Sequence, residues 1–256
     1  MISLPARSAA IPLRLLSVAA AAALLTGCTK VPSASDDFAF QGQYAQQPDP
    51  AKWDPAPWST QPDHHWIAPD SSGNGILHLK SNCTGNCSSD VILDQQWELG
   101  GIESNVTLTP PFFIGVRAKV SSMSTSFNAP LWLMSPCVEI DVSEQLGRQP
   151  TTNWNIIHNW CPSDREAGIS RDCGVVFANR YHDFWAYVTL RKVEFHVDQN
   201  SACSSTIRAS DVGLSDFGGG FTVHIDELAG CRPFPYCQAN PPPAVMLVDY
   251  IRTSRP

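Results

Sequence analysis

The sequence predicts an all-β domain built as a sandwich or barrel of short strands. Short runs of β-branched, aromatic and other apolar residues recur along the chain, and glycine, proline, asparagine or aspartate separates them. No long stretch after residue 28 has the periodicity of an amphipathic helix. Several turn-separated strands of this kind are typical of sandwiches and barrels. The clearest runs are residues 75–80, 113–120, 138–142, 193–197, 221–225 and 245–251.

The first residues have the composition of an export signal. Arg7 and Arg14 precede an apolar run at residues 15–25, which is too short to span a bilayer as a helix. The run ends in Leu-Thr-Gly-Cys, which resembles the lipobox of bacterial lipoproteins, where the signal is cut before the cysteine and the thiol is acylated. We therefore expect residues 1–27 to be a lipoprotein signal peptide and Cys28 to be lipidated. The alternative is an ordinary signal peptide with a chance cysteine.

The rest of the chain divides into a tether and one domain. Residues 28–50 contain the lipidated cysteine and a polar segment rich in proline, serine and glutamine, which is typical of a flexible tether. Residues 51–256 have an ordinary size for one all-β domain. The residue after Cys28 is Thr29 rather than aspartate, which by resemblance favours the outer membrane or the cell surface. We expect an exported, membrane-anchored monomer.

Charge and cysteine content limit the partners and cofactors. The formal net charge is −7, which argues against nucleic acid as a partner, because phosphates require a basic face. Eight cysteines follow Cys28, and an even number in an exported chain indicates disulfides. The spacing of the cysteines does not match the usual zinc sites, so we expect no metal centre. The local pairs that we expect are Cys83–Cys87, Cys161–Cys173 and Cys231–Cys237.

Three acidic residues lie in one predicted strand. Apolar and acidic residues alternate from residue 138 to 142, which predicts one buried and one wet face. Glu139 and Asp141 then share the wet face, and a one-residue β-bulge near Ser143 would bring Glu144 to the same face. Acids this close must have different pKa values, so that one can be ionised while another is protonated, as acid–base chemistry requires. On spacing alone, a solvated acidic strand is the alternative.

Residues 139–144 also resemble the Glu-x-Asp-x-x-Glu signature of glycoside hydrolase family 16, in the form with the bulge. The resemblance implies that Glu139 is the nucleophile, that Asp141 assists it and that Glu144 is the acid/base. Other segments resemble the family in the same order, among them residues 113–120, 131–134, 155–160, 193–198 and 246–252. It implies a β-jelly-roll sandwich of the concanavalin A-like type, with an open cleft on the concave sheet. Retaining, endo-acting hydrolysis of β-1,4 or β-1,3 bonds is the expected activity.

The resemblance also implies substrate-binding residues. Trp132 precedes the acidic strand and is expected to floor the cleft, and His158 to lie beside the nucleophile, with a structural histidine as the alternative. Apart from the resemblance, Trp160 is a candidate to stack on a sugar ring, with core packing as the alternative. No cofactor is expected, and the sequence does not show whether calcium is bound. Gly115 and Trp185 depart from the family pattern, and we expect these differences to alter the cleft walls.

The resemblance implies a polysaccharide substrate and leaves the identity of the polysaccharide open. Residues 155–160 and 248–253 look closest to the carrageenase and agarase branches, which favours a galactan such as carrageenan, agar or porphyran. Sulfated galactans call for arginines in the cleft, and four arginines follow the acidic strand: Arg148, Arg165, Arg171 and Arg180. A β-1,3-glucanase of the laminarinase type is the closest alternative. A non-catalytic glycan-binding lipoprotein is an alternative of another class, and a structural, disulfide-rich lipoprotein is a third.

Overall fold

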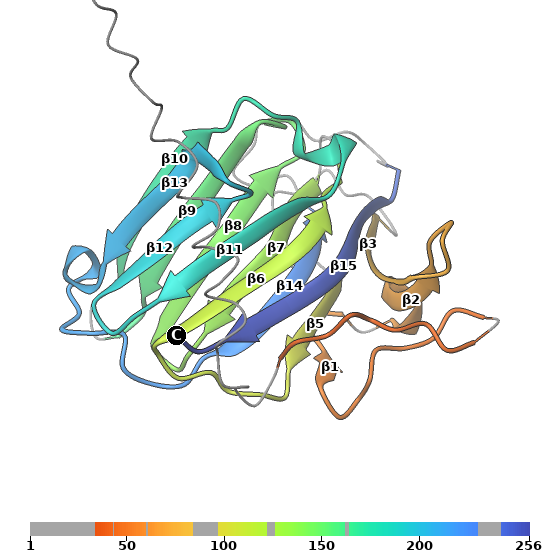
Figure 1. Cartoon of the computed structure of the whole chain (residues 1–256), viewed down its shortest axis with the longest axis horizontal. Helices are drawn as coiled ribbons and strands as arrows, with labels where there is room; N and C mark the ends of the chain where they lie inside the picture. Colours follow the sequence, from red (N-terminus) through yellow and green to blue (C-terminus); the bar gives the residue numbers. More distant parts are fainter. Residues whose placement is uncertain are drawn as a thin grey trace, which may run out of the picture.

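Two antiparallel sheets pack face to face, as the sequence predicts for a jelly-roll sandwich (Figure 1). The computed structural model describes residues 34–42, 44–59, 61–83, 97–121, 126–161, 164–229 and 242–256. The expected signal peptide and the lipidation site at Cys28 lie outside these residues. Among the described residues no helix is long and apolar enough to cross a membrane.

One sheet has seven strands and carries the acidic motif. Its spatial order is β1 (Trp53–Pro55), β5 (Gly100–Ser104), β14 (Thr222–Ala229), β7 (Ser126–Met134), β8 (Val138–Leu146), β9 (Thr152–Asn159) and β10 (Arg165–Asp172). The hairpin of β8 and β9 lies near one edge, so the acidic strand has a neighbour on each side.

The second sheet covers the inner face of the first. Its strands follow the order β13 (Asn200–Arg208), β12 (Lys192–Val197), β11 (His182–Val188), β6 (Phe112–Lys119), β15 (Ala244–Ser254), β3 (Gly75–Cys83) and β2 (His65–Pro69), while β4 (Trp97–Glu98) pairs with β3. Three short 3-10 helices complete the described elements: η1 (Pro62–His64), η2 (Phe177–Asn179) and η3 (Ala209–Val212).

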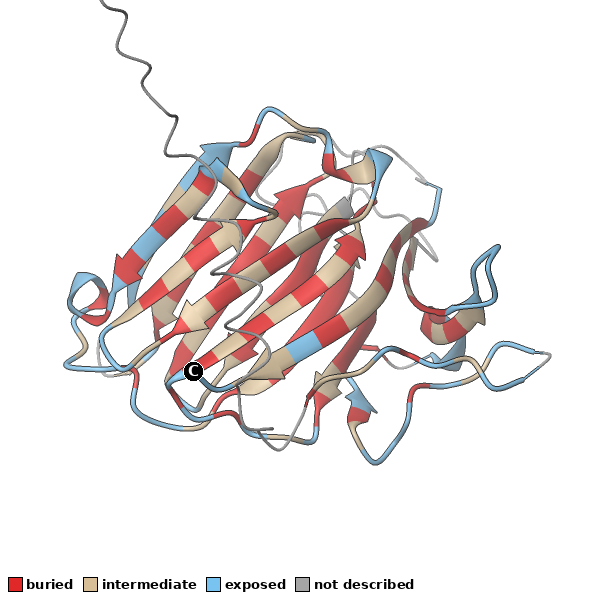
Figure 2. Ribbon diagram, in the orientation of Figure 1, coloured by how far each residue is buried: buried red, intermediate tan, exposed pale blue. Residues whose placement is uncertain are grey.

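The core lies between the sheets and is built by alternation along each strand. In β6 every second residue is buried, and the residues between them are only partly exposed. Figure 2 shows the same alternation of buried and intermediate residues along the front strands. Each large apolar side chain that is fully buried in this way contributes about 1.5–3 kcal/mol to folding. Residues that meet between the sheets include Phe112, Ile114 and Val116 on one side and Leu131, Leu133, Ile140 and Val142 on the other.

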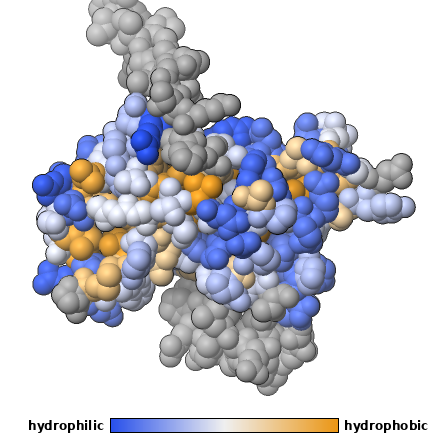
Figure 3. Space-filling view, turned by 90° about the horizontal axis from the view of Figure 1, so that it is seen from below, coloured by the Kyte–Doolittle hydropathy of each residue, from blue (hydrophilic) through white to orange (hydrophobic). Residues whose placement is uncertain are grey.

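The outer surface is chemically mixed. Seen from below, hydrophobic patches are interrupted by strongly hydrophilic residues (Figure 3). This distribution is ordinary for a sandwich that keeps its large apolar side chains between the sheets.

Two disulfides lie in the described residues, and one corrects an expectation. Cys161 bonds to Cys137, and Cys173 bonds to Cys203, so the expected Cys161–Cys173 pair is wrong. In both bonds the Cα atoms are 5.2 Å apart. The error came from pairing cysteines that are close in sequence, whereas sheet pairing brings more distant ones together. The expected Cys83–Cys87 and Cys231–Cys237 pairs involve residues whose side chains lie outside the described part.

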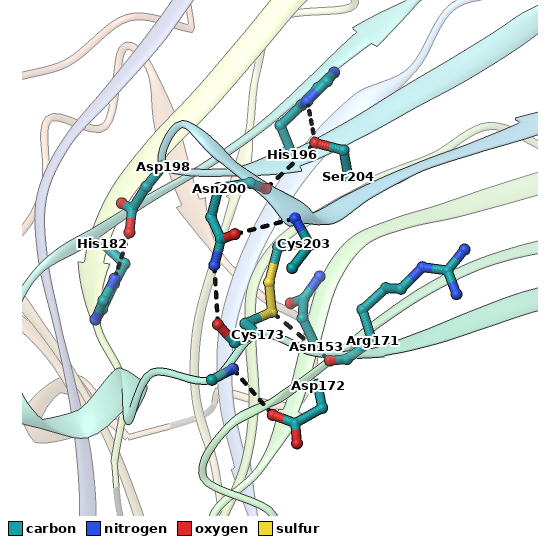
Figure 4. The surroundings of a disulfide bond; sticks show 12 residues. Asn153, Arg171, Asp172, Cys173, His182, His196, Asp198, Asn200, Cys203 and Ser204 are labelled. Carbon is teal, nitrogen blue, oxygen red and sulfur yellow. Dashed lines mark hydrogen bonds and ion pairs between the residues drawn. A yellow bond between two sulfur atoms is a disulfide. The ribbon is translucent and has the colours of Figure 1, made fainter.

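Figure 4 shows the surroundings of the Cys173–Cys203 bond, which ties the end of β10 to β13 in the other sheet. Asn200 donates a hydrogen bond to the carbonyl oxygen of Cys173 (2.9 Å). Nearby, a ring nitrogen of His182, a fully buried residue, lies 2.8 Å from a carboxyl oxygen of Asp198. The disulfide and the Asn200 hydrogen bond join the two sheets at one end of the sandwich, whereas the His182–Asp198 contact lies within the eight-stranded sheet.

Gly115 and Trp185 do not lie near the acidic motif, which corrects the expectation that they shape the cleft. They are direct partners on β6 and β11, in the eight-stranded sheet. The neighbours of Trp185, Phe184 and Ala186, are fully buried, so Trp185 faces outward on that sheet. A Cβ atom at position 115 would meet the Cβ of Trp185 at 3.0 Å. The absence of a side chain at Gly115 therefore leaves room for Trp185. Both residues lie on the eight-stranded sheet and not on the sheet that carries the acids.

Candidate active site

A β-bulge turns Glu144 toward the face that carries Glu139. Along β9, His158 pairs with Glu139 and Trp154 pairs with Glu144, and the register shifts between Asp141 and Glu144. His158 and Trp154 are an even number of residues apart, so they share one face of β9. Directly opposed residues of an antiparallel pair point to the same side. The two glutamates therefore share one face of the sheet.

Pairing with β7 locates the extra residue. Trp132 pairs with Asp141 and Leu131 pairs with Ser143, so Val142 has no partner of its own. The sequence places the bulge near Ser143, and the structure places it one residue earlier. Val142 is buried, whereas Glu139 and Glu144 are only partly buried on the outer side of the sheet.

Burial and mutual repulsion separate the acids into different protonation states. Burial raises the pKa of Glu144 to about 8, and the nearby charges of Glu139 and Glu166 act in the same direction. Glu144 is therefore protonated at neutral pH. Burial also raises the pKa of Glu139, but His158 and two hydrogen bonds oppose that shift. Glu139 is the acid of the pair that ionises more readily.

Asp141 lies between the two glutamates and is almost fully buried. Its burial, with the charges of Glu144 and Glu139, raises its pKa well above the ordinary value. The hydrogen bond between Asp141 and Glu139 raises the pKa of Asp141 and lowers that of Glu139, so Asp141 is the donor. A protonated Asp141 thus stabilises an ionised Glu139.

His158 connects this group to the neighbouring strand. Its Nε2 atom is 3.5 Å from a carboxyl oxygen of Asp141, and its Nδ1 atom is 3.5 Å from a carboxyl oxygen of Glu166 on β10. Glu139, His158 and Glu166 are consecutive partners across β8, β9 and β10. The imidazole therefore lies between two carboxyl groups, next to the expected nucleophile. Sequence reasoning did not identify Glu166, because its relation to His158 depends on strand register.

Trp160 lies beside His158 at the end of β9. Their rings stack with centroids 4.9 Å apart and an interplanar angle of 6°. Trp160 hydrogen-bonds to Glu139, and 45% of its surface remains exposed. Its backbone N–H donates to the carbonyl oxygen of Cys137, which is disulfide-bonded to Cys161. This end of the β8–β9 hairpin is thus held in place while the indole stays accessible.

Trp132 belongs to a group of three stacked rings on the other side of the acids. Its centroid is 4.1 Å from that of His224 on β14 and 5.8 Å from that of Trp58, which precedes η1. The indole N–H groups of Trp132 and Trp58 donate to the two carboxyl oxygens of Asp226, one each. Burial raises the pKa of Asp226 to about 8 and lowers that of His224 to about 4.

The sequence analysis missed Trp58, His224 and Asp226. Trp58 lies far from the acidic motif in sequence, and only the fold brings it to Trp132. His224 and Asp226 alternate with the buried residues Val223 and Ile225, a pattern that could have marked them as outward-facing.

The outer face of the seven-stranded sheet is acidic. Only β10 contains arginine or lysine among its seven strands, namely Arg165 and Arg171. Both are paired with asparagines whose side chains lie on the core side of β9, so neither arginine shares the face of Glu166. Arg148 lies in the turn between β8 and β9, and Arg180 follows η2. The acids on this face are Asp54, Glu103, Glu139, Asp141, Glu144, Glu166, Asp172 and Asp226.

Two other features of the described residues resemble binding sites. A cavity of about 520 Å³ lies at the edge of the eight-stranded sheet, away from the acids, and is lined by Ala45, Gln47, Pro62, Asp63, Trp66 and Lys80. Ligand atoms of Glu139, Asp141 and His158 all lie within 4.8 Å of one another, which is close enough to hold a cation. Within this cluster Asp141 and Glu139 are hydrogen-bonded to each other.

Comparison with solved structures identifies the fold. The laminarinase catalytic domain of Thermotoga maritima is similar with a TM-score of 0.67 and 19% identity, over 87% of this chain and 96% of that one. A glycoside hydrolase family 16 endo-glucanase from Bacteroides ovatus is similar with a TM-score of 0.67 and 15% identity, over 86% of this chain and 98% of that one. An endo-β-1,3-glucanase from Pyrococcus furiosus is similar with a TM-score of 0.64 and 18% identity, over 86% of this chain and 92% of that one.

This chain has the fold of these endo-glucanases. Neither the sequence models of known families nor the curated protein sequences match it. The shared fold spans most of this chain and nearly the whole of each neighbour.

Proposed function

We propose that the protein is a retaining, endo-acting glycoside hydrolase of family 16. The observation that carries this proposal is the bulge at Val142, which places Glu139 and Glu144 on one face of the sheet. The glucanase fold supports it. In this proposal Glu139 is the nucleophile, Asp141 its hydrogen-bond donor, and Glu144 the acid/base.

The protonation states suit a double displacement. Glu144 begins protonated and transfers its proton to the glycosidic oxygen as that bond to the anomeric carbon breaks. The carboxylate of Glu139 attacks the anomeric carbon from the opposite side and forms a glycosyl-enzyme ester. Glu144, now ionised, removes a proton from water, and the resulting hydroxide displaces Glu139. The second attack restores the original anomeric configuration and both starting protonation states.

Aromatic rings on both sides of the acids would bind neighbouring sugars. Trp132, stacked with Trp58 and His224, lies toward β14, whereas Trp160, stacked with His158, lies at the end of β9. Indole rings bind the apolar faces of sugars, and their N–H groups reach polar partners. A chain lying across both groups would present an internal bond to Glu139 and Glu144, which supports endo action.

The acidic face favours a neutral β-glucan with β-1,3 or mixed linkages as substrate. Sulfate groups would lie against Glu139, Glu144 and Glu166 without a basic side chain from these seven strands to neutralise them. The solved neighbours include endo-β-1,3-glucanases and a non-specific endo-β-1,3(4)-glucanase. We therefore rank laminarin-type and mixed-linkage glucans above the sulfated galactans that the sequence favours.

We also propose that the protein is an exported lipoprotein held at the outer membrane or cell surface through Cys28, and that it acts as a monomer. The support is the apolar run followed by Leu-Thr-Gly-Cys. Metabolic labelling with a fatty acid should modify the full chain and leave a Cys28→Ala variant unlabelled. Equal labelling of both would contradict lipidation at this residue.

A product assay tests the activity. The chain would be incubated with laminarin, lichenan, agar, porphyran and carrageenan, with Glu139→Gln as the matched inactive control. We expect new reducing ends from laminarin or lichenan, released as oligosaccharides. Retardation in affinity electrophoresis without any reducing ends would instead indicate a glycan-binding protein, and neither result would indicate a structural one.

A further inference from the structure

The core beneath the acids is unusually polar. In β9 three of the four inward positions hold buried asparagines, Asn153, Asn155 and Asn159, and the fourth holds Ile157, while Trp154, Ile156 and His158 point outward. This is the reverse of the usual pattern, in which amides face water and large apolar residues face the core. The outward residues line the proposed substrate face, which leaves the three buried amides to be explained.

Asn155 bonds directly to the bulge. Its side-chain amide donates to the backbone carbonyl oxygen of Val142 at 2.6 Å. Val142 is the extra residue of β8, so the bulge disrupts the regular ladder at this carbonyl. The side-chain oxygen of Asn155 accepts a hydrogen bond from Ser205 on β13 at 2.8 Å. The bulge is therefore tied through one amide to the opposite sheet.

The next residue of the strand is held by a second buried group. Ser143 donates to the side-chain oxygen of Asn153 at 2.6 Å, and the Gln145 amide donates to the same oxygen at 3.1 Å. All three side chains are buried. These bonds fix the strand between Asp141 and Glu144, where the register changes.

Stability alone does not require this cluster. A neutral hydrogen bond contributes only about 1 kcal/mol net, and apolar side chains of similar shape can do as well. A buried amide that uses both its donor and its acceptor, as Asn155 does, nevertheless selects one backbone geometry over its alternatives. A regular β8 without the bulge would leave the Asn155 amide without its Val142 partner.

We infer that Asn155 is a positioning residue that holds the Val142 bulge and thereby sets Glu144 against Glu139. The inference rests on the proposed hydrolase function. Asn155 lies on the core side of the sheet and does not contact a substrate bound on the outer face. Its effect on turnover acts through the backbone of β8.

The test compares two amides of the same strand in the full chain. Asn155→Leu removes the donor to Val142, and Asn159→Leu is the control, because Asn159 instead donates to the carbonyl oxygen of Val212 in η3 at 3.0 Å. Displacing a catalytic group by about 1 Å can cost about 100-fold in rate, and we expect a kcat loss of that order for Asn155→Leu with little change in KM. Asn159→Leu should lose thermal stability to a similar extent and keep its kcat.

Wild-type kcat in a folded Asn155→Leu variant, or an equal loss in Asn159→Leu, would overturn the inference. If Asn155→Leu does not fold, Ser205→Ala is tested instead, because it keeps the Asn155 amide but removes the hydroxyl that donates to it. We expect a smaller fall in kcat for Ser205→Ala, and an unchanged kcat would contradict the inference. If the wild-type chain hydrolyses no substrate, the proposed function fails separately. A crystal structure of Asn155→Leu then decides: the inference requires a changed register between Asp141 and Glu144, and an unchanged bulge at Val142 refutes it.

Discussion

Glu144 and Glu139 lie on the same face of β8 although an odd number of positions separates them. In a regular strand such residues point to opposite sides. Val142 supplies the extra residue that restores the parity, and Trp154 and His158 on β9 mark the shared face. The chemistry that we propose depends on this local change of register.

Inserting one alanine after Val142 should abolish hydrolysis, because the added residue would turn Glu144 into the core while Glu139 stays outside. Val142→Ala, which keeps the residue count, should retain most of the kcat. Near-ultraviolet circular dichroism would confirm that both variants are folded before their rates are compared. Substantial turnover by a folded insertion variant would show that the shared face is not needed.

The rate should fall at alkaline pH because Glu144 loses the proton that it must donate. Its pKa is raised to about 8 by burial and by the charges of Glu139 and Glu166. We expect kcat/KM for the free enzyme to decrease above about pH 8. Glu166→Gln removes one of those charges, so it should move this alkaline limb to lower pH. A limb that does not move would assign the titration to another group.

Thermal stability should fall between about pH 7 and 8. Burial raises the pKa values of Glu144 and Asp226 to about 8, and those of Asp141 and Glu227 well above their ordinary values. Such acids keep protons in the folded state that the unfolded chain has lost. Each such acid therefore lowers the free energy of unfolding as the pH rises toward about 8, by at most about 1.4 kcal/mol per pH unit. Buried histidines such as His224, whose pKa is lowered, oppose this slope only below about 6.5, where the unfolded chain binds the proton.

Glu227→Gln provides a check on this slope. Both carboxyl oxygens of Glu227 are buried without a hydrogen-bond partner among the described residues. Removing the titratable group should raise the melting temperature at pH 8 more than at pH 7. Melting temperatures from calorimetry that rise from pH 7 to 8 in the wild-type chain would contradict the account.

Much of the sandwich is predictable from sequence because its strands alternate strongly. The predicted runs at residues 113–120 and 193–197 correspond to β6 and β12, where buried and partly exposed residues alternate. β10 was not predicted, since its sequence, Arg-Glu-Ala-Gly-Ile-Ser-Arg-Asp, is largely polar and exposed and has no clear apolar period. It forms by pairing with β9 along its whole length.

The candidate site was predictable where it is local and unpredictable where it depends on register. Glu139, Asp141 and Glu144 occur within one strand, so their pattern is visible in the sequence. Asp226 and Trp58 reach Trp132 only through pairing of distant strands and loop packing. The same limit explains the wrong Cys161–Cys173 pair.

Asp226→Asn should weaken substrate binding more than turnover. In its ionised form, which predominates above pH 8, Asp226 accepts from the indole N–H groups of Trp132 and Trp58, one on each oxygen, whereas an amide offers only one acceptor, so binding is compared above pH 8. Leaving a buried N–H unpaired costs about 1–3 kcal/mol, which should loosen one ring of the platform and raise KM. Tryptophan fluorescence should shift to longer wavelength as that ring becomes exposed.

A double-mutant cycle makes this prediction specific. Trp58→Phe keeps a ring but removes one N–H donor, so the single acceptor of asparagine suffices in the Trp58→Phe, Asp226→Asn double variant. The double variant should therefore lose less binding than the sum of the two single variants. Strictly additive losses would mean that Asp226 does not hold both rings.

Azide rescue on an activated aryl β-glucoside oligosaccharide tests the roles of Glu139 and Glu144 most directly. With Glu144→Ala, azide should attack the glycosyl-enzyme formed on Glu139 and give the β-glycosyl azide. With Glu139→Ala, azide should take the place of the nucleophile and give the α-glycosyl azide. The same anomer from both variants, or the reverse assignment, would contradict the account.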